Sequence, residues 1–474
     1  MNAREDMAKD AVEIGTRLEP FVDDWLIESM DDVCLQLHPP EKHDIALEFS
    51  TPWEGPSSAY ITVMQVDDRY RMYYRGSGRH PSPEVTCCAE SEDGITWDRP
   101  HFGIFEHDGS TENNIVWTDV GSHNLMPFKD SNPHAPDEER FKALGGGYIG
   151  LTSPDGLHWK KIREEKIIDP FVKCVGDGDW IGQAFWDSEQ QQYVAYVRGW
   201  RITPSTRFQH EMPAVDDGTP YPVCHVPGSF RQVLRCTSSD FVEWTEPTFI
   251  NFGDAPLEHF YTNAITPYFR APHVYLSFPK RFSPERTKIA DHGKEGVSDA
   301  VFMSSRDGVN WDRRFMEAFI RPGLDQKNWT QRNNMPAWGL LPTAHDEISL
   351  YYSENYDHPT GRVRRATVRT DGFVSVHADY QGGEFVTRPL VFGGSELVVN
   401  YSTSAVGSIR VEIQDVDGNP CTGRTLTDSP EVFGDEIEHA FEWKGGSDLR
   451  HLGGQPVRLR FVMNDADLYS IRFR

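Results

Sequence analysis

A short motif that recurs along the chain constrains the fold more than any other sequence feature. It reads Ser-x-Asp-(Gly)-x-x-Trp in four copies, and a fifth, degenerate copy follows. The copies lie at residues 91–97, 153–159, 238–244, 305–311 and 369–373. Their aspartates are 62, 85, 67 and 64 residues apart, so a unit longer than a helical solenoid repeat recurs along the chain. This interval suits a four-stranded propeller blade.

The residue types of the motif predict how each unit is built. Asp-Gly after a serine favours a tight turn, and the tryptophan is expected to begin the next strand with its ring beneath that turn. Paired β-rich runs precede the copies, at residues 59–66 with 70–74, 184–186 with 193–197, and 264–269 with 274–278. Short strands separated by polar turns indicate an all-β fold. We therefore expect a five-bladed β-propeller over residues 51–383.

The two ends of the chain follow other patterns. From residue 384 onward, polar and apolar residues alternate in several short runs, which predicts a C-terminal β-sandwich over residues 384–474. Residues 1–50 contain the apolar run 21–27 and are expected to contribute a closing strand to the ring. Residues 201–230 are rich in proline, glycine and charge, which indicates a long loop over one face.

The net charge and the hydropathy of the chain limit the classes of partner that it is expected to bind. The chain has 47 Lys and Arg against 73 Asp and Glu, a net charge of −26, which disfavours nucleic acid and anionic lipid. No apolar run is long enough for a membrane helix, and residues 1–19 lack a signal-peptide core. We expect a cytoplasmic protein with no nucleic-acid or membrane partner. The sequence does not set an oligomeric state, and its seven cysteines form no C-x-x-C pair.

Polar residues open the strand expected to be innermost in each blade. Alignment of the five motif copies places these openings at residues 53–55, 122–124, 178–180, 257–259 and 331–333. Core strands usually begin with apolar residues, so polar openings are candidates for a functional site. Three of the openings carry a carboxylate, at Glu54, Asp179 and Glu258.

Five blades, a C-terminal β-sandwich and acidic openings together resemble the five-bladed β-propeller glycoside hydrolases. This superfamily includes arabinanases, β-xylosidases, invertases and levansucrases, in glycoside hydrolase families 43 and 32. The resemblance covers the architecture over about residues 20–474, whereas the invertase Asn-Asp-Pro-Asn-Gly run and the Arg-Asp-Pro triplet are absent. It therefore implies a reaction type but not a sugar. In that superfamily the innermost strands begin at the mouth of a funnel, where their first residues converge.

The resemblance implies cleavage of a glycosidic bond by paired carboxylates. It makes Glu54 the base or nucleophile, Glu258 the acid, and Asp179 the residue that fixes the sugar and tunes the acid. Each carboxylate has a plain alternative role, as a hydrogen-bonded group at a strand start on a solvated rim. If the blade alignment is shifted, the next carboxylates to consider are Asp23, Asp24 and Asp130, which also suit turns.

Further polar and aromatic residues near the openings are candidates for substrate binding. They are His123, Asn124, Trp180, Arg198, Arg201, His259, Tyr261 and Arg332. Arginines gathered on the funnel face would hold a substrate carboxylate or sulfate, or they would pair with the funnel carboxylates and keep them ionised. No residue spacing indicates a catalytic metal, and no organic cofactor is expected. A structural calcium ion in the propeller channel would suit oxygen ligands.

These observations predict a glycoside hydrolase acting on a small glycan or oligosaccharide, with furanosides and acidic or sulfated sugars among the substrates considered. Two alternatives stay open. A non-catalytic carbohydrate-binding propeller would use the funnel acids only as hydrogen-bonding groups. A protein-interaction scaffold would instead show an apolar patch on the funnel face and no convergent acids. Two carboxylates about 5 to 10 Å apart would distinguish a hydrolase from a binding module.

Overall fold

The computed structural model describes residues 11–77, 84–169, 182–201, 203 and 228–474. The chain forms two compact units. The larger contains Pro40–Tyr268 and Pro272–Thr367, and the smaller contains Met1–Pro39, Phe269–Ala271 and Val368–Arg474. None of the helices in the described ranges has the length and hydropathy needed to cross a membrane.

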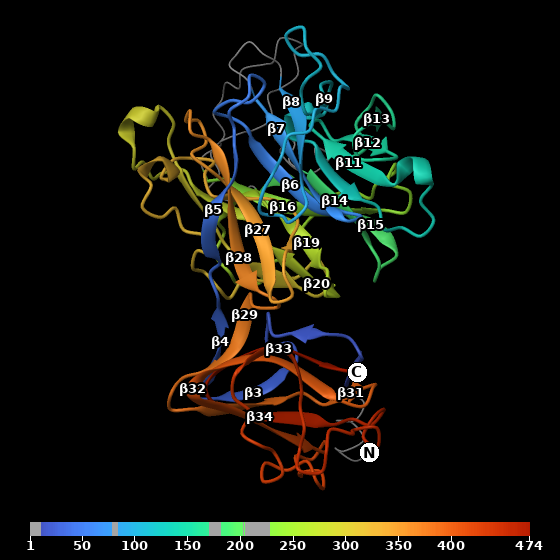
Figure 1. The fold of residues 1–474 in the computed structure, drawn as a ribbon, viewed down its shortest axis with the longest axis vertical. Coiled ribbons are helices and arrows are strands. Elements are labelled where there is room, and N and C mark those ends of the chain that lie inside the picture. Colours follow the sequence, from blue (N-terminus) through green and yellow to red (C-terminus); the bar gives the residue numbers. More distant parts are fainter. Residues whose placement is uncertain (1–10, 78–83, 170–181, 202, 204–227) are drawn as a thin grey trace. The chain divides into compact units, whose positions relative to one another are not determined.

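The larger unit is the expected five-bladed β-propeller, and its sheets follow one another along the chain (Figure 1). The first blade contains β6 (Ala59–Val66), β7 (Arg69–Gly76), β8 (Val85–Ser91) and β9 (Ile115–Trp117). The second contains β10 (Met126–Lys129), β11 (Phe141–Gly145), β12 (Ile149–Ser153) and β13 (Lys160–Lys161). The third contains β14 (Gly182–Asp187), β15 (Gln192–Arg201), β16 (Phe230–Ser238) and β17 (Thr248–Phe249).

The last two blades depart from this simple order. The fourth contains β19 (Ile265–Tyr268), β20 (Ala271–Ser277), β23 (Met303–Ser305) and β24 (Trp311–Asp312). A three-stranded sheet adjoins it in sequence, formed by β18 (His259–Thr262), β21 (Lys280–Ser283) and β22 (Val297–Ala300). The fifth contains β25 (Met335–Pro336), β26 (Leu341–Pro342), β27 (Glu347–Glu354), β28 (Arg362–Arg369) and β5 (Glu41–Glu48). Short 3-10 helices are η1 (Ser122–Asn124), η2 (Asp137–Glu139), η4 (Ala290–His292) and η5 (Gln326–Asn328).

Two sets of contacts join the first and last blades. β5 precedes the first blade in sequence but pairs with β28 as the outermost strand of the fifth. Near the axis, the backbone N–H of Val63 donates to the carbonyl of Trp338 at 2.8 Å, and that of Trp338 donates to the carbonyl of Ile61 at 2.9 Å. The ring is therefore closed by strands that are distant in sequence.

The motif forms the same turn in four blades, between the third and fourth strands. In the first blade, the Ser91 hydroxyl accepts from the Gly94 N–H at 2.8 Å, and the Asp93 carboxylate accepts from the next two N–H groups at 2.7 and 2.8 Å. The residue after the aspartate has a positive φ, which favours glycine. The third blade has Phe241 there instead, at φ 66°. Equivalent bonds form around Asp155, Asp240 and Asp307.

All four motif turns contact the preceding blade, and the third does so through the ring of Phe241, whose centroid lies 5.5 Å from that of Phe128 in the second blade. The Tyr351 hydroxyl of the fifth blade donates to the carbonyl of Gly94 in the first. The Tyr196 hydroxyl of the third blade donates to the carbonyl of Gly308 in the fourth at 2.8 Å. A Cβ on Gly156 would lie 2.6 Å from the Tyr73 hydroxyl of the first blade. The turns therefore act as latches between blades, which explains why the motif is repeated.

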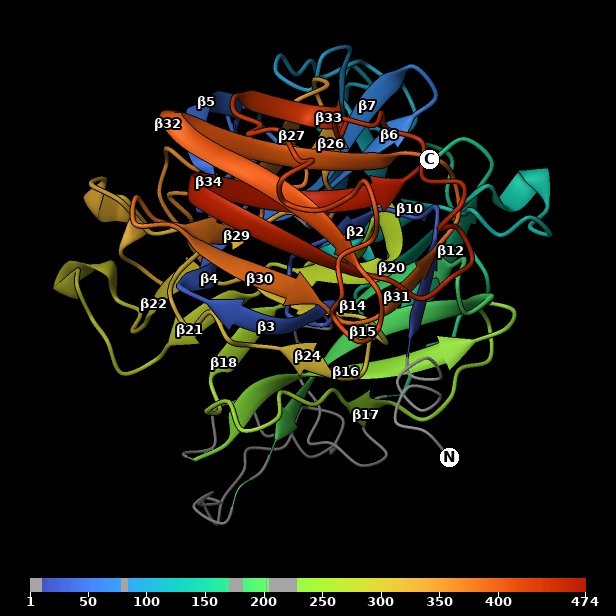
Figure 2. The same cartoon turned by 90° about the horizontal axis from the view of Figure 1, so that it is seen from below.

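The smaller unit is a β-sandwich, as expected, and its strands run side by side in Figure 2. Its main sheet contains β2 (Glu19–Pro20), β3 (Ile27–Asp31), β4 (Val33–Leu37), β29 (Val374–Ala378), β30 (Gly383–Thr387), β32 (Leu397–Gln414), β33 (Asp435–Ala440) and β34 (Arg458–Phe473). β1 (Val12–Gly15) pairs separately with β31 (Leu390–Phe392). The long strands β32 and β34 surround a core that includes Phe385, Phe461 and Trp443.

The sheet pairings differ from the expected boundaries at two places. Residues 1–50 do not act as one segment, because β2, β3 and β4 pair within the smaller unit and only β5 joins the ring. The sandwich also begins before residue 384, since β29 pairs with β4 and β34. The reason is that the fifth motif copy leads directly into β29 instead of into a fourth blade strand. The expected long loop at 201–230 lies largely outside the described residues.

Candidate functional site

Cationic side chains gather at the end of the blades opposite the motif turns. Because neighbouring strands are antiparallel, first strands begin, second strands end and third strands begin at this edge. The first, third and fifth blades and the three-stranded sheet of β18, β21 and β22 contribute to what we call the axial cation cluster. Its members are Arg75 on β7, Arg198 on β15, Arg231 on β16, Lys280 on β21, and Arg332 before β25.

Four of these cations surround one buried tyrosine ring. The ammonium nitrogen of Lys280 lies 3.6 Å from the ring centroid of Tyr261, and the guanidinium carbon of Arg198 lies 4.5 Å from it. The guanidinium carbons of Arg231 and Arg332 lie 5.3 and 5.6 Å from the same centroid. Cations over an aromatic face are attracted by its quadrupole, so the ring helps to hold like charges together.

Two guanidinium groups share a single phenol at the axis. Nη2 of Arg75 and Nη1 of Arg332 donate to the Tyr356 hydroxyl at 3.0 and 3.1 Å. The two nitrogens are therefore at most about 6 Å apart, where like charges repel by about 3 kcal/mol at an effective dielectric constant near 20. Burial raises the pKa of nearby Tyr60 well above its ordinary value, and Tyr261 adds to this, while Arg332 and Arg75 oppose it. The two guanidinium groups therefore favour a negative charge at Tyr60, but the effect of burial is larger.

A carboxylate and an imidazole lie beside Arg75. Glu84 directly precedes β8, and its carboxylate contacts Nδ1 of His123 and lies 3.4 Å from Nη1 of Arg75. The side chains of Glu84 and His123 are each about one third exposed. The His123 ring also lies 6.3 Å from the Tyr60 ring. A partly exposed Glu–His pair can hold a proton and transfer it to a bound group.

The expected base, Glu54, lies on the other face of the first blade. Its fully buried carboxylate accepts from the Tyr74 hydroxyl at 2.6 Å, from Arg99 at 2.9 and 3.0 Å, and from two backbone N–H groups. Tyr74 and Arg75 are consecutive on β7, so their side chains point to opposite faces. Glu54 is therefore a fully buried carboxylate paired with Arg99, and its expected role as the base stays a prediction.

The expected acid, Glu258, is also held by arginines on the far face of its sheet. Its carboxylate accepts from Arg281 at 2.9 Å and from Arg313 at 2.8 Å. Lys280 and Arg281 are consecutive on β21, so Arg281 and Glu258 face away from the axial cation cluster. Both oxygens of Glu258 therefore accept hydrogen bonds from arginines, and its expected role as the acid stays a prediction.

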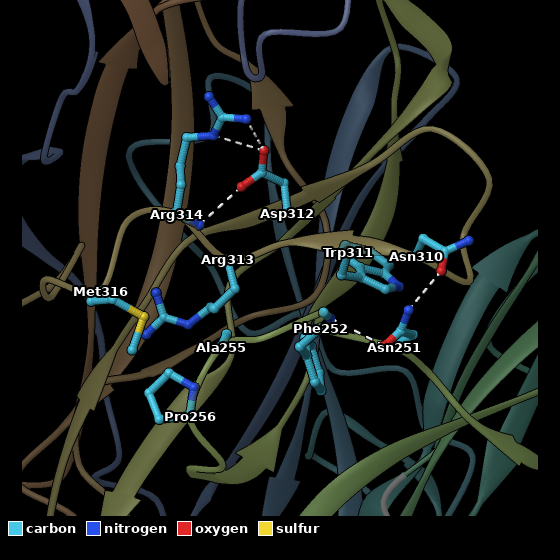
Figure 3. A pocket seen from close by; sticks show the side chains of 11 residues that line it. Asn251, Phe252, Ala255, Pro256, Asn310, Trp311, Asp312, Arg313, Arg314 and Met316 are labelled. Atoms are coloured by element: carbon cyan, nitrogen blue, oxygen red, sulfur yellow. Dashed lines mark hydrogen bonds and ion pairs between the residues drawn. The ribbon is translucent and has the colours of Figure 1, made fainter.

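A pocket of about 580 Å³ opens beside Arg313 on the fourth blade (Figure 3). Figure 3 shows Arg314 turned toward Asp312, and Asn251 toward Asn310. The Arg313 side chain is only 1% exposed, and no member of the axial cation cluster lines the pocket. This pocket is therefore separate from the axial site.

The remaining expected binding residues are divided between several places. His123, Arg198, Tyr261 and Arg332 lie at the axis, as described above. The guanidinium carbon of Arg201 instead lies 4.6 Å from the ring centroid of Phe249, in the outermost strand of the third blade. Nδ1 of His259 accepts from the backbone N–H of Arg231 at 3.2 Å, and Asn124 is buried at the end of η1. Asp179 and Trp180 lie outside the described residues.

Sequence reasoning missed Arg75, Glu84, Arg231, Tyr60 and Tyr356. The motif alignment examined only the openings of first strands, whereas Arg75 ends a second strand, and Glu84 and Arg231 lie at the start of third strands. Extending the alignment to those two strand ends would have found all three. In the described ranges, no group of three or more His, Cys, Asp or Glu side chains could hold a metal ion. The expectation of a calcium ion stays a prediction.

No protein-family model matches the chain, and no curated protein matches it in sequence. Among solved structures it is similar to one titled "Glycoside hydrolase", at 13% identity and a TM-score of 0.47 over 70% of this chain and 92% of that one. It is also similar to a glycosyl hydrolase from Bacteroides ovatus, at 13% identity and a TM-score of 0.41 over 74% of this chain and 96% of that one.

A third similar structure is an N-acetylgalactosamine deacetylase from F. plautii in complex with blood group B trisaccharide. It is 12% identical, with a TM-score of 0.44 over 72% of this chain and 96% of that one. Other structures that the chain resembles have titles that name glycosidases and glycoside hydrolases.

Proposed function

We propose that the protein is a glycoside hydrolase whose reaction takes place at the propeller axis. The observation that carries this proposal is the convergence of polar side chains from four blades and from the three-stranded sheet of β18, β21 and β22 on one end of the axis. His123, on η1 before the first strand of the second blade, joins the axial cation cluster. A purely structural core would bury apolar side chains here, because charged groups are costly to bury. The resemblance of the sequence to propeller glycosidases supports the reaction class.

Glycosidic bond cleavage needs a proton donor for the leaving oxygen and a base or nucleophile. The Glu84–His123 pair is positioned to move a proton at the axis. We propose Asp179, the remaining carboxylate expected from the sequence, as its counterpart. Tyr356 accepts from two guanidinium groups, so its own proton is available to a bound oxygen. In this proposal, Glu54 and Glu258 stabilise the fold and take no part in the chemistry.

The test is a hydrolysis screen with aryl glycosides and oligosaccharides, including furanosides and charged sugars. We expect Glu84→Gln and Asp179→Asn each to lower kcat by at least about 100-fold, the usual scale of lost acid or base catalysis. Glu92→Gln is the matched control, because Glu92 lies at the motif end of the first blade with its side chain 80% exposed. Full activity in both axial variants would overturn the assignment.

A carbohydrate-binding propeller without catalysis is the second candidate. It is favoured by the fact that arginines hold the carboxylates of both Glu54 and Glu258. Saturable binding of a sugar with no cleavage of any member of the panel would establish it.

A further inference from the structure

We infer that the ligand of the axial site carries an anionic group, a carboxylate or a sulfate, which binds between Arg75 and Arg332. The inference rests on the proposed function in one respect, namely that the ligand bearing this group is a sugar. It concerns the same site but a separate property, namely the charge that the site selects.

The axis differs in charge from the chain as a whole. The chain carries a net charge of −26, so a group of charged side chains taken at random from it would be mostly acidic. The axis instead gathers five cationic side chains, four of them around the ring of Tyr261. Cationic side chains gathered in this way attract an anion and oppose a further cation.

The geometry of Arg75 and Arg332 also suits an anion. Both donate to the Tyr356 hydroxyl, which brings two like charges together at one point. Nε of Arg75 is buried and has no hydrogen-bond partner among the described residues. Arg332 reaches this point from a left-handed backbone, at φ 61°, which is strained for a residue with a side chain. An anion placed here would accept charge-assisted hydrogen bonds from both guanidinium groups.

The two guanidinium groups also limit the shape of the anion. Guanidinium groups present paired N–H donors that match the oxygens of a carboxylate or a sulfate. The Tyr356 hydroxyl adds a neutral donor between them. Glu84, which contacts Arg75 and His123, would lie beside the bound anion. A uronic acid and a sulfated sugar share the required chemistry, and the experiment separates them.

The experiment measures binding by calorimetry and cleavage by product analysis for matched substrate pairs. Each pair contains a neutral glycoside and either its uronide or its sulfate ester. We expect one charged member to bind about 100-fold more tightly than its neutral partner, with an affinity that falls as salt increases. The uronide arm and the sulfate arm identify which anion is preferred.

Arg75→Gln and Arg332→Gln should each reduce this preference to a few-fold. Arg75→Lys keeps the charge but loses the paired donors, so it should retain an intermediate preference. Arg69→Gln is the matched control, because Arg69 lies on the same strand with its side chain 52% exposed and paired with Glu92. Circular dichroism and thermal unfolding of each variant show whether it is folded.

The outcomes separate this inference from the proposed function. Equal binding of charged and neutral partners overturns the inference, even if both are cleaved. Preferential binding of a charged partner without cleavage supports the inference and rejects the hydrolase. A preference that survives in both folded Gln variants, or no binding of any charged member at millimolar concentration, overturns the inference.

Discussion

The two ends of the propeller blades differ in how much they repeat. At one end, four blades form the same Ser–Asp turn with the same hydrogen bonds. At the other end, each blade contributes different residues, among them Arg75 from the first, His123 from the second and Arg332 from the fifth. Repetition marks what every blade needs, which is attachment to its neighbour. Residues that do not repeat are free to build one asymmetric site, so the axial end is where function is expected.

The largest expected effect tests whether Glu54 belongs to the scaffold or to the site. Glu54→Gln leaves the Arg99 guanidinium, whose side chain is 22% exposed, without its charge partner, and breaking a fully buried pair costs at most about 3 to 5 kcal/mol. Urea unfolding followed by tryptophan fluorescence measures this loss. The activity per folded molecule should stay near that of the wild type. A stable Glu54→Gln protein that has lost its activity would return Glu54 to the catalytic site.

A smaller effect tests the one motif turn that has no glycine. Phe241→Gly removes the strain of a positive φ, worth about 1 kcal/mol, but also deletes a fully buried ring, worth about 3 to 5 kcal/mol. The ring packs on Phe128 of the second blade at 5.5 Å between centroids. We expect a net loss of about 2 to 4 kcal/mol in the free energy of unfolding. Unchanged stability would show that backbone conformation, and not the ring, governs this turn.

The charge of a motif aspartate has a pH-dependent effect. Burial alone would raise the pKa of Asp155, but hydrogen bonds from His158 and Leu157 lower it to about 2. A lowered folded-state pKa means that the stabilisation is present above about pH 4 and is lost as the pH falls toward 2. Asp155→Asn should cost about 1 to 2 kcal/mol at pH 7 and flatten the acid dependence. Urea unfolding at pH 7 and pH 3 measures the loss of stability and its dependence on pH. If stability falls between pH 7 and pH 3 by the same amount in Asp155→Asn as in the wild type, this explanation is contradicted.

The smallest effect concerns a single latch between blades. Tyr196→Phe removes the hydrogen bond to the carbonyl of Gly308, which is worth about 1 kcal/mol. Thermal unfolding should show a small downward shift in Tm. Tyr380→Phe is the control and should leave Tm unchanged, because the Tyr380 side chain is 67% exposed in the smaller unit. Equal shifts in the two variants would mean that the latch contributes nothing.

The sequence predicted how far along each strand a residue lies better than which face it occupies. The repeated motif marks one end of each blade and so indicates how far from that end a residue lies. The propeller and the axial positions of Arg198 and Arg332 could therefore be predicted. Side chains alternate between the faces of a strand, and an odd offset places them on opposite sides. Arg201 is three residues from Arg198 on the same strand, so its side chain points to the opposite face. It stacks on Phe249 of the outer strand and does not reach the axis.

The same limit explains the carboxylates. Glu54 lies near the expected level but on the Tyr74 face of β7, and Glu258 lies on the Arg281 face of β21. Spacing between motifs carries no information on which face a residue before a strand will join. Tyr356 follows β27 in a loop and is brought to the axis by bonds such as that from its N–H to Asn333, which no repeat indicates.

The pairing of β5 with β28 affects how the protein can be made. His43 and Thr367, which bond across these two strands, are 324 residues apart. During translation, β5 therefore leaves the ribosome long before β28, the strand with which it pairs. During that interval its unpaired edge can associate with other nascent chains, as exposed strand edges tend to do. Contacts this distant also slow folding, so chaperones that hold the emerging chain should increase the yield of native protein in cells.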